Sequence, residues 1–194
     1  MDITDTNRSN KAILLLVGGG LLVGLAIGLI LFTRLNSGQD APQTAAEALE
    51  VEVAPAIGSL APDFSLTNIW TGEAITLREL QGQPVIINFW ATWCGPCRIE
   101  MPAIQAAYDR HQADNLVVLA VNFDEPPEAV SAFGESLNLS FPILLDPGGE
   151  IQKVYRVRAY PSTFFIAPDG IVTSLQLGLM TEDQLAEHIG KIIP

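Results

Sequence analysis

With 194 residues, the chain has room for one domain of ordinary size and a further segment. Its formal net charge at pH 7 is −12, since 22 Asp and Glu residues outnumber 10 Lys and Arg residues. This acidic excess argues against nucleic acid or an anionic membrane surface as a partner, because both attract basic proteins. The other interpretation of the charge is a well-solvated surface.

An apolar run without charges, at residues 12–32, is the first element that the sequence predicts. Its 21 residues, at about 1.5 Å each, would span roughly 30 Å, which is the thickness of the bilayer core. A signal peptide usually has an apolar region of only about 7–15 residues, so a retained transmembrane anchor is predicted. Cleavage near residues 37–41 is the alternative.

The charges on either side of this run predict its orientation. Arg8 and Lys11 precede it and Arg34 follows it, which favours a cytoplasmic location for residues 1–11. The rest of the chain would then lie outside the cytoplasm, as part of a single-pass protein of the cell membrane.

A flexible linker and an α/β domain are predicted after the anchor. Residues 33–57 have little apolar periodicity, as a solvated linker would, and the domain is expected over residues 58–194. Residues 85–90 are mostly apolar and rich in β-branched and aromatic side chains, which is typical of a strand buried on both faces. The other expected strands lie at residues 64–67, 74–77, 116–123, 141–145, 163–166 and 172–177, and the helices at 98–112, 127–137, 149–155 and after the cap residue Thr181.

Both cysteines of the chain, Cys94 and Cys97, stand between the strand at 85–90 and the helix after it. The Cys94 sulfur is therefore expected at a helix N-terminus, where free N–H groups and the helix dipole stabilise a thiolate. A free thiol has a pKa of about 8.5, and such surroundings lower it to about 3.5–7.5. We predict that Cys94 is the nucleophile. Cys97, one turn further in, would be the resolving thiol that attacks the mixed disulfide.

The cysteine pair has two alternative uses, a zinc site and a static structural disulfide. Half of a zinc site would need further ligands, and the two histidines, His111 and His188, lack the close spacing of such sites. A static structural disulfide across two residues would close too small a loop to add much stability. We therefore expect a redox-active disulfide, with no other cofactor and no metal.

Residues 93–97 read Trp93-Cys94-Gly95-Pro96-Cys97, which is identical to the thioredoxin active site. The wider pattern resembles the TlpA/ResA group of membrane-anchored, thioredoxin-fold thiol–disulfide oxidoreductases over roughly residues 57–194. Its marks are Ala61-Pro62-Asp63-Phe64, Glu100 and Pro102 after Cys97, and Tyr160-Pro161-Ser162-Thr163-Phe164-Phe165. The resemblance implies a thioredoxin-like three-layer α/β fold with an N-terminal strand extension, preceded by one transmembrane helix.

The resemblance also implies a substrate groove. Pro161 is expected to follow a cis peptide bond and to face the disulfide, which would turn the Tyr160 backbone towards Cys94 as an edge for a substrate chain. The alternative is an ordinary trans proline at the start of a strand. The residues expected to bind substrate are Trp93, Gly95, Pro96, Tyr160 and Pro161.

Proton transfer is where the chain departs from thioredoxin. Thioredoxin carries a buried aspartate six residues before the nucleophile, and this chain has Asn88 there. We predict that Glu100, three residues after Cys97 and near the same helix face, accepts the proton instead. A partly exposed glutamate with no buried network is expected, and a solvated surface glutamate without a catalytic role is the alternative. Glu125 is the second candidate.

The predicted function is the reduction of protein disulfides outside the cytoplasm. The resemblance implies cytochrome c maturation or copper-site assembly in oxidases, with apocytochrome c or copper-site proteins as substrates and a membrane electron donor of the DsbD/CcdA type. One alternative is a copper(I) carrier that uses the two thiolates. The other is a peroxiredoxin-like peroxidase, which would need Thr three residues before its cysteine, where this chain has Ala91.

Overall fold

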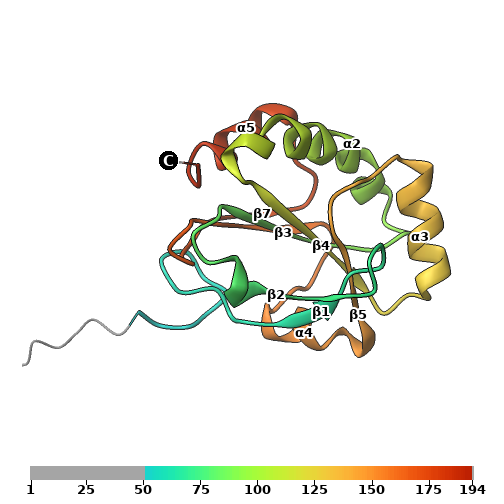
Figure 1. Cartoon of the computed structure of the whole chain (residues 1–194), viewed down its shortest axis with the longest axis horizontal. Helices are drawn as coiled ribbons and strands as arrows, with labels where there is room; N and C mark the ends of the chain where they lie inside the picture. Colours follow the sequence, from blue (N-terminus) through green and yellow to red (C-terminus); the bar gives the residue numbers. More distant parts are fainter. Residues whose placement is uncertain (1–50, 194) are drawn as a thin grey trace, which may run out of the picture. The chain divides into compact units, whose positions relative to one another are not determined.

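Five strands form one central sheet in the spatial order β5-β4-β3-β6-β7 (Figure 1). The middle strand β3 (Val85–Trp90) pairs in parallel with β4 (Val117–Phe123) and antiparallel with β6 (Ser162–Ile166). β5 (Ile143–Asp146) extends the parallel side and β7 (Val172–Leu177) the antiparallel side. All six residues of β3 are buried, as its apolar sequence predicts.

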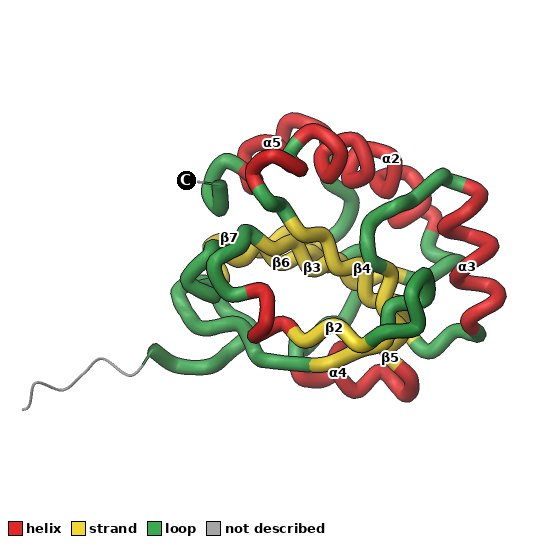
Figure 2. Tube along the Cα trace, viewed as in Figure 1, coloured by secondary structure: helices red, strands yellow, loops and turns green. Residues whose placement is uncertain are grey.

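Helices and a short strand pair cover the two faces of this sheet (Figure 2). α2 (Gly95–Arg110) and α5 (Glu182–Ile189) contact each other on one face. The antiparallel pair β1 (Ser65–Thr67) and β2 (Ala74–Thr76) lies on the other face. The remaining helices are α3 (Pro127–Ser136) and α4 (Glu150–Val154), and short 3-10 turns occupy Leu77–Leu80, Gln112–Asp114 and Pro147–Gly149.

Alternating side chains of β3 belong to two separate hydrophobic clusters, one on each face of the sheet. Ile86 and Trp90 belong to the cluster beneath α2, α3 and α5, whereas Ile87 and Phe89 belong to the cluster that the N-terminal strand pair covers. Successive side chains of a strand point to opposite faces, so a wholly apolar strand requires a layer on each side. The described residues therefore show the expected layered α/β arrangement with an N-terminal strand extension.

The computed structural model describes residues 51–193 of the chain. The predicted cytoplasmic segment (1–11), the anchor (12–32) and the first part of the linker lie outside the described residues. Among residues 51–193, no helix is long and apolar enough to cross a membrane.

The folded unit begins earlier than Gly58, where the sequence placed its start. It includes residues from Val51 onward. Ala54 is buried, and its N–H donates a hydrogen bond to the Leu60 carbonyl at 3.0 Å, while the Leu60 N–H donates to Glu52 at 2.9 Å. These backbone bonds tie the end of the expected linker to the domain.

Two helix starts show how local sequence sets element boundaries. α2 begins at Gly95, three residues before the expected start, because Pro96 fits the first turn of a helix, where its missing N–H costs nothing. α5 begins after Thr181, as predicted. The Thr181 side chain accepts from the Gln184 N–H at 3.3 Å, and the Gln184 side chain accepts from the Thr181 N–H at 2.9 Å.

Candidate active site

The cysteine pair forms a disulfide at the start of α2, with Cα atoms 5.3 Å apart. Cys94 is the N-cap residue, and its Sγ accepts a hydrogen bond from the Cys97 N–H at 3.2 Å. In the reduced protein, this position would stabilise a thiolate on Cys94. Cys97 is fully buried and Cys94 is 5 % exposed, which is the order expected for a resolving thiol and a nucleophile. Those roles stay predictions.

Three of the predicted substrate-binding residues adjoin the cysteines in sequence, and one of these, Trp93, contacts a fourth, Tyr160. Gly95 and Pro96 occupy the first two positions of α2 and are exposed. Trp93 is 66 % exposed, and its ring meets that of Tyr160 edge-on, with centroids 5.6 Å apart. The structure thus brings together two residues that lie 67 positions apart, beside Cys94.

The peptide bond between Tyr160 and Pro161 is cis, as expected. Pro161 is buried at the start of β6, and its carbonyl accepts a hydrogen bond from the Gly178 N–H at 2.8 Å. This hydrogen bond joins one backbone group of the predicted substrate groove to the residue that follows β7. The binding role of Pro161 stays a prediction.

Glu100 is not the partly exposed glutamate that the sequence suggested, because it is only 2 % exposed. Its Oε1 accepts from the Asn88 side-chain amide at 2.8 Å, and its Oε2 accepts from the Met180 N–H at 3.2 Å. The same Asn88 amide also donates to Thr163 Oγ1 at 2.9 Å. The expectation of a residue without a buried network is therefore wrong, and so is the alternative of a solvated surface glutamate.

Burial has a large effect on the Glu100 carboxyl. It raises the pKa of Glu100 from 4.5 to about 7, because a carboxylate loses its hydration there. The hydrogen bonds from Asn88 and Met180 lower the pKa and so offset part of this rise. A carboxyl with a pKa near neutral pH can both accept and release a proton there, which general acid–base catalysis requires.

Glu125, the second candidate, lies among hydrogen-bond donors. It accepts from the Thr92 N–H at 2.7 Å, from the Thr92 hydroxyl, and from the Asn122 side-chain amide at 2.7 Å. These bonds connect the end of β4 to the loop that carries Trp93 and Cys94. Glu125 thus links β4 to the cysteine loop, and its role as a proton acceptor stays a prediction.

Sequence reasoning missed two residues beside Tyr160. Phe123, the last residue of β4, is 36 % exposed, and its ring centroid lies 6.0 Å from that of Tyr160. Gln152 in α4 is buried and accepts a hydrogen bond from the Tyr160 hydroxyl. A signal for Phe123 did exist, because the carboxyl ends of parallel strands meet at one edge of a sheet, and β3 leads to Cys94. No sequence signal pointed to Gln152.

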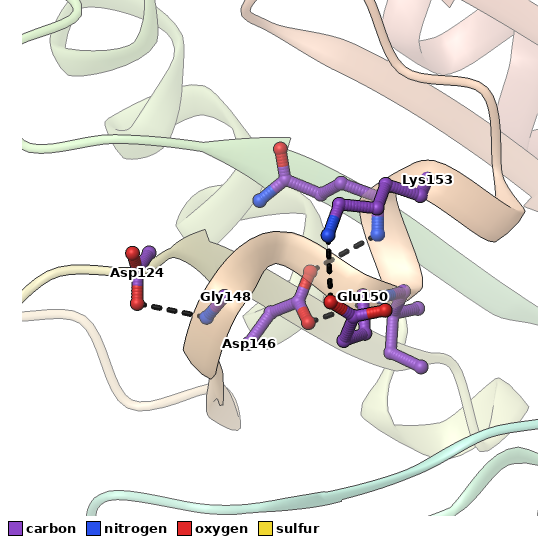
Figure 3. A network of polar contacts seen from close by, with 7 residues as sticks. Asp124, Asp146, Gly148, Glu150 and Lys153 are labelled. Atoms are coloured by element: carbon purple, nitrogen blue, oxygen red, sulfur yellow. Dashed lines mark hydrogen bonds and ion pairs between the residues drawn. The ribbon is translucent and has the colours of Figure 1, made fainter.

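A buried aspartate fixes the turn that carries Gln152 (Figure 3). Asp146 is 1 % exposed and accepts hydrogen bonds from the N–H groups of Ile151 and Gln152, each at 3.0 Å. Nearby, Asp124 accepts from the Gly148 N–H at 2.8 Å. These bonds connect β5, the turn after it and the start of α4, so Gln152 has a rigid support.

Comparisons with known proteins agree with this geometry. The model of the AhpC/TSA family matches residues 57–175. The chain is 40 % identical to the thioredoxin-like protein YneN of Bacillus subtilis over 135 residues, which cover 68 % of this chain and 78 % of YneN. It is 39 % identical to the thiol-disulfide oxidoreductase ResA of Bacillus cereus over 138 residues, which cover 71 % of this chain and 79 % of ResA.

Solved structures show the same similarity. The crystal structure of StoA from Bacillus subtilis matches with a TM-score of 0.58 and 34 % identity, over 66 % of this chain and 96 % of StoA. A protein described as a thiol:disulfide interchange protein DsbE, from Chlorobium tepidum, matches with a TM-score of 0.67 and 29 % identity, over 72 % of this chain and 99 % of that protein. The thioredoxin-like fold and the resemblance stated from the sequence are confirmed.

Proposed function

The chain belongs to the AhpC/TSA family and is a thiol–disulfide oxidoreductase, and we propose that it works mainly as a reductant of disulfide bonds in other proteins. The observation that carries this proposal is the disulfide that caps α2, with Cys97 buried and Cys94 at the helix N-terminus. The Gly95-Pro96 pair between the cysteines, which is the thioredoxin pair, supports the direction of reduction.

In the first step of the proposed reaction, the Cys94 thiolate attacks one sulfur of a substrate disulfide. A bond forms between Cys94 and that sulfur while the substrate S–S bond breaks, and the second substrate sulfur leaves as a thiolate. Cys97 then loses its proton and attacks the Cys94 sulfur, so that the first substrate sulfur leaves as well. Two electrons have then passed to the substrate, and the Cys94–Cys97 disulfide remains. A second dithiol protein must reduce it again.

Glu100 is the proposed acceptor of the Cys97 proton. It follows Cys97 by three residues on α2, and its raised pKa of about 7 keeps a substantial fraction of the carboxylate available at neutral pH. A negative carboxylate also makes a second negative charge nearby unfavourable, so it should hold Cys97 as a thiol until the mixed disulfide forms. The two groups would titrate as a coupled pair.

A second part of the proposal concerns the cellular location of the protein and its partners. We place the domain outside the cytoplasm, anchored by residues 12–32, with apocytochrome c or a copper-site protein as the substrate. The reductant would be a membrane protein of the DsbD/CcdA type. The TlpA/ResA resemblance and the apolar N-terminal run support this assignment.

Reduction of insulin by the full-length protein, with dithiothreitol as electron source, tests the proposal. The wild type should accelerate insulin precipitation and Cys94→Ser should not. No acceleration by the wild type would contradict a reductase. A Cys97→Ala variant should accumulate mixed disulfides through Cys94, and it would also allow the substrate to be isolated from cells.

Two further assays of the same protein test the alternatives, a copper(I) carrier and a peroxidase. Copper bound stoichiometrically by anaerobically purified protein, without insulin reduction, would favour the copper(I) carrier. Consumption of hydrogen peroxide at the expense of dithiothreitol, again without insulin reduction, would favour the peroxidase. Ala91, at the position where a peroxidase needs Thr, argues against that second outcome.

A further inference from the structure

We propose that Trp93, Tyr160 and Phe123 form an aromatic surface that favours substrates with a large apolar side chain next to the attacked cysteine. Gln152 would be the positioning residue that holds this surface in shape. The inference rests on the proposed function, because it names the class of disulfide that the reductase would prefer.

The Trp93 and Phe123 rings each contact the ring of Tyr160. Its ring meets Trp93 edge-on, at an interplanar angle of 78°, and lies tilted by 36° against Phe123. Centroid distances of 5.6 and 6.0 Å fall within the range in which aromatic pairs attract each other. Because Trp93 directly precedes Cys94, the surface is continuous with the sulfur that would bind the substrate.

Two of the three rings, those of Trp93 and Phe123, are exposed, which is unusual for side chains of their size, and Tyr160 between them is half-buried. Trp93 is 66 % exposed and Phe123 36 %, although other large aromatic side chains of the sheet, such as Trp90 and Phe89, are fully buried. Aromatic side chains that line a binding site bury much apolar surface when a partner covers them. A Phe, Tyr or Leu side chain beside the substrate cysteine would supply that cover.

Charge near the surface narrows the choice of substrate further. Burial raises the pKa of the Tyr160 hydroxyl, and the negative charges of Asp146 and Glu125 raise it more. Geometry supports this for Asp146, which accepts from the N–H of Gln152, the same residue whose side-chain oxygen accepts from the Tyr160 hydroxyl. An acidic side chain on the substrate would be repelled here, whereas a neutral apolar one would not.

Gln152 connects the surface to the interior of the domain. Its side-chain oxygen accepts from the Tyr160 hydroxyl, and its N–H donates to the buried Asp146. Gln152 is only 4 % exposed, so it acts on the substrate through Tyr160 and not by contact. Loss of the bond would free the Tyr160 ring and loosen its packing against Trp93 and Phe123.

The test uses three peptides, each with one intramolecular disulfide, that differ only in the residue next to the first cysteine: Phe, Ser or Glu. We expect the reduced wild-type protein to favour the Phe peptide over the Ser peptide by about 10-fold in kcat/KM. The Glu peptide should be the slowest. Phe123→Ala should lower the Phe-to-Ser ratio to about 2-fold, mainly through KM. Ile57→Ala, at a residue that is 66 % exposed outside this surface, is the matched control and should keep the wild-type ratio.

Two further variants test the positioning role. Tyr160→Phe removes only the hydroxyl and Gln152→Met removes its acceptor, so each should lower the Phe-to-Ser ratio by about 2- to 5-fold. The double variant should lower it no further than either change alone, because both remove the same hydrogen bond. A purely structural role for Gln152 would instead lower the rates for all three peptides equally and leave the ratio unchanged.

Three different results would overturn three different parts of this proposal. If the wild type reduces insulin but treats the Phe and Ser peptides alike, or if Phe123→Ala keeps the wild-type ratio, the aromatic surface does not select substrates. If Tyr160→Phe and Gln152→Met both keep the ratio, the positioning role is wrong. If the wild type reduces neither insulin nor any peptide, the proposed function fails and this inference fails with it.

Discussion

Two carboxylates lie near the cysteine loop in contrasting surroundings. Glu100 is buried, receives one hydrogen bond on each oxygen, and has its pKa raised to about 7. Glu125 receives three hydrogen bonds, from Thr92 and from Asn122, and joins the loop to β4. A desolvated carboxyl with few hydrogen-bond donors around it is suited to proton transfer, whereas a carboxyl that accepts from several donors is suited to a structural role. We propose that environment, and not residue type, gives Glu100 a role in proton transfer and Glu125 a structural one.

The largest expected effect concerns the free energy of unfolding. The folded state binds the Glu100 proton more tightly than the unfolded state does, because the folded pKa is about 7 and the ordinary value is 4.5. Stability should therefore fall as the pH rises from about 4.5 to about 7, by up to about 3 kcal/mol from this group. Denaturant titrations of the oxidised protein at a series of pH values measure this.

The Glu100→Gln variant should lose that part of the pH dependence, because an amide does not ionise in this range. Glu128→Gln, at an exposed position in the first turn of α3, is the control and should keep it. Equal slopes in the wild type and Glu100→Gln between pH 4.5 and 7 would mean that Glu100 ionises normally in the folded protein.

The next effect concerns the rate of the second chemical step. Glu100→Gln keeps the size of the side chain but removes the proton acceptor, so resolution of the mixed disulfide at pH 7.5 should slow by about 10-fold or more. Stopped-flow release of a chromogenic thiol from Cys94 measures this step directly. In the wild type the rate should also fall below about pH 7, as Glu100 becomes protonated. An unchanged rate in the variant would assign the proton to solvent or another group.

A smaller effect is expected for the other carboxylate. Glu125→Gln replaces charge-assisted hydrogen bonds to Thr92 and Asn122 by neutral ones, which should cost about 1 kcal/mol of stability. The fall in resolution rate below pH 7 should remain, because Glu100 is intact. If that fall disappears in Glu125→Gln and persists in Glu100→Gln, the two roles are reversed.

Local sequence located most of the helices and strands, whereas the thioredoxin-like fold and the cis bond before Pro161 were implied by the family resemblance. The apolar run of β3, the proline in the first turn of α2 and the Thr181 cap each carry a short-range physical signal, and all three elements occur as predicted or within three residues of it. The cysteine pair and the cis bond before Pro161 also lie where the sequence placed them.

The surroundings of the site could not be predicted in the same way. Glu100 is buried and accepts a hydrogen bond from the N–H of Met180, 80 residues later, and no pattern around position 100 encodes that contact. Phe123 resembles any other aromatic residue of a strand until the fold places it beside Tyr160. Gln152 acquires its role through a hydrogen bond to a residue in another element. Contacts between distant segments, and not local preferences, decide these properties.

The ionisation of Glu100 itself tests the central contrast most directly. The measurement is a pH titration of the side-chain carboxyl signals of oxidised, full-length protein labelled with ¹³C-glutamate, with Glu100→Gln to assign the signal. The account predicts a midpoint near pH 7 for the signal that the variant lacks. A midpoint near 4.5 would contradict it, because Glu100 would then be fully ionised at neutral pH, as an exposed glutamate is.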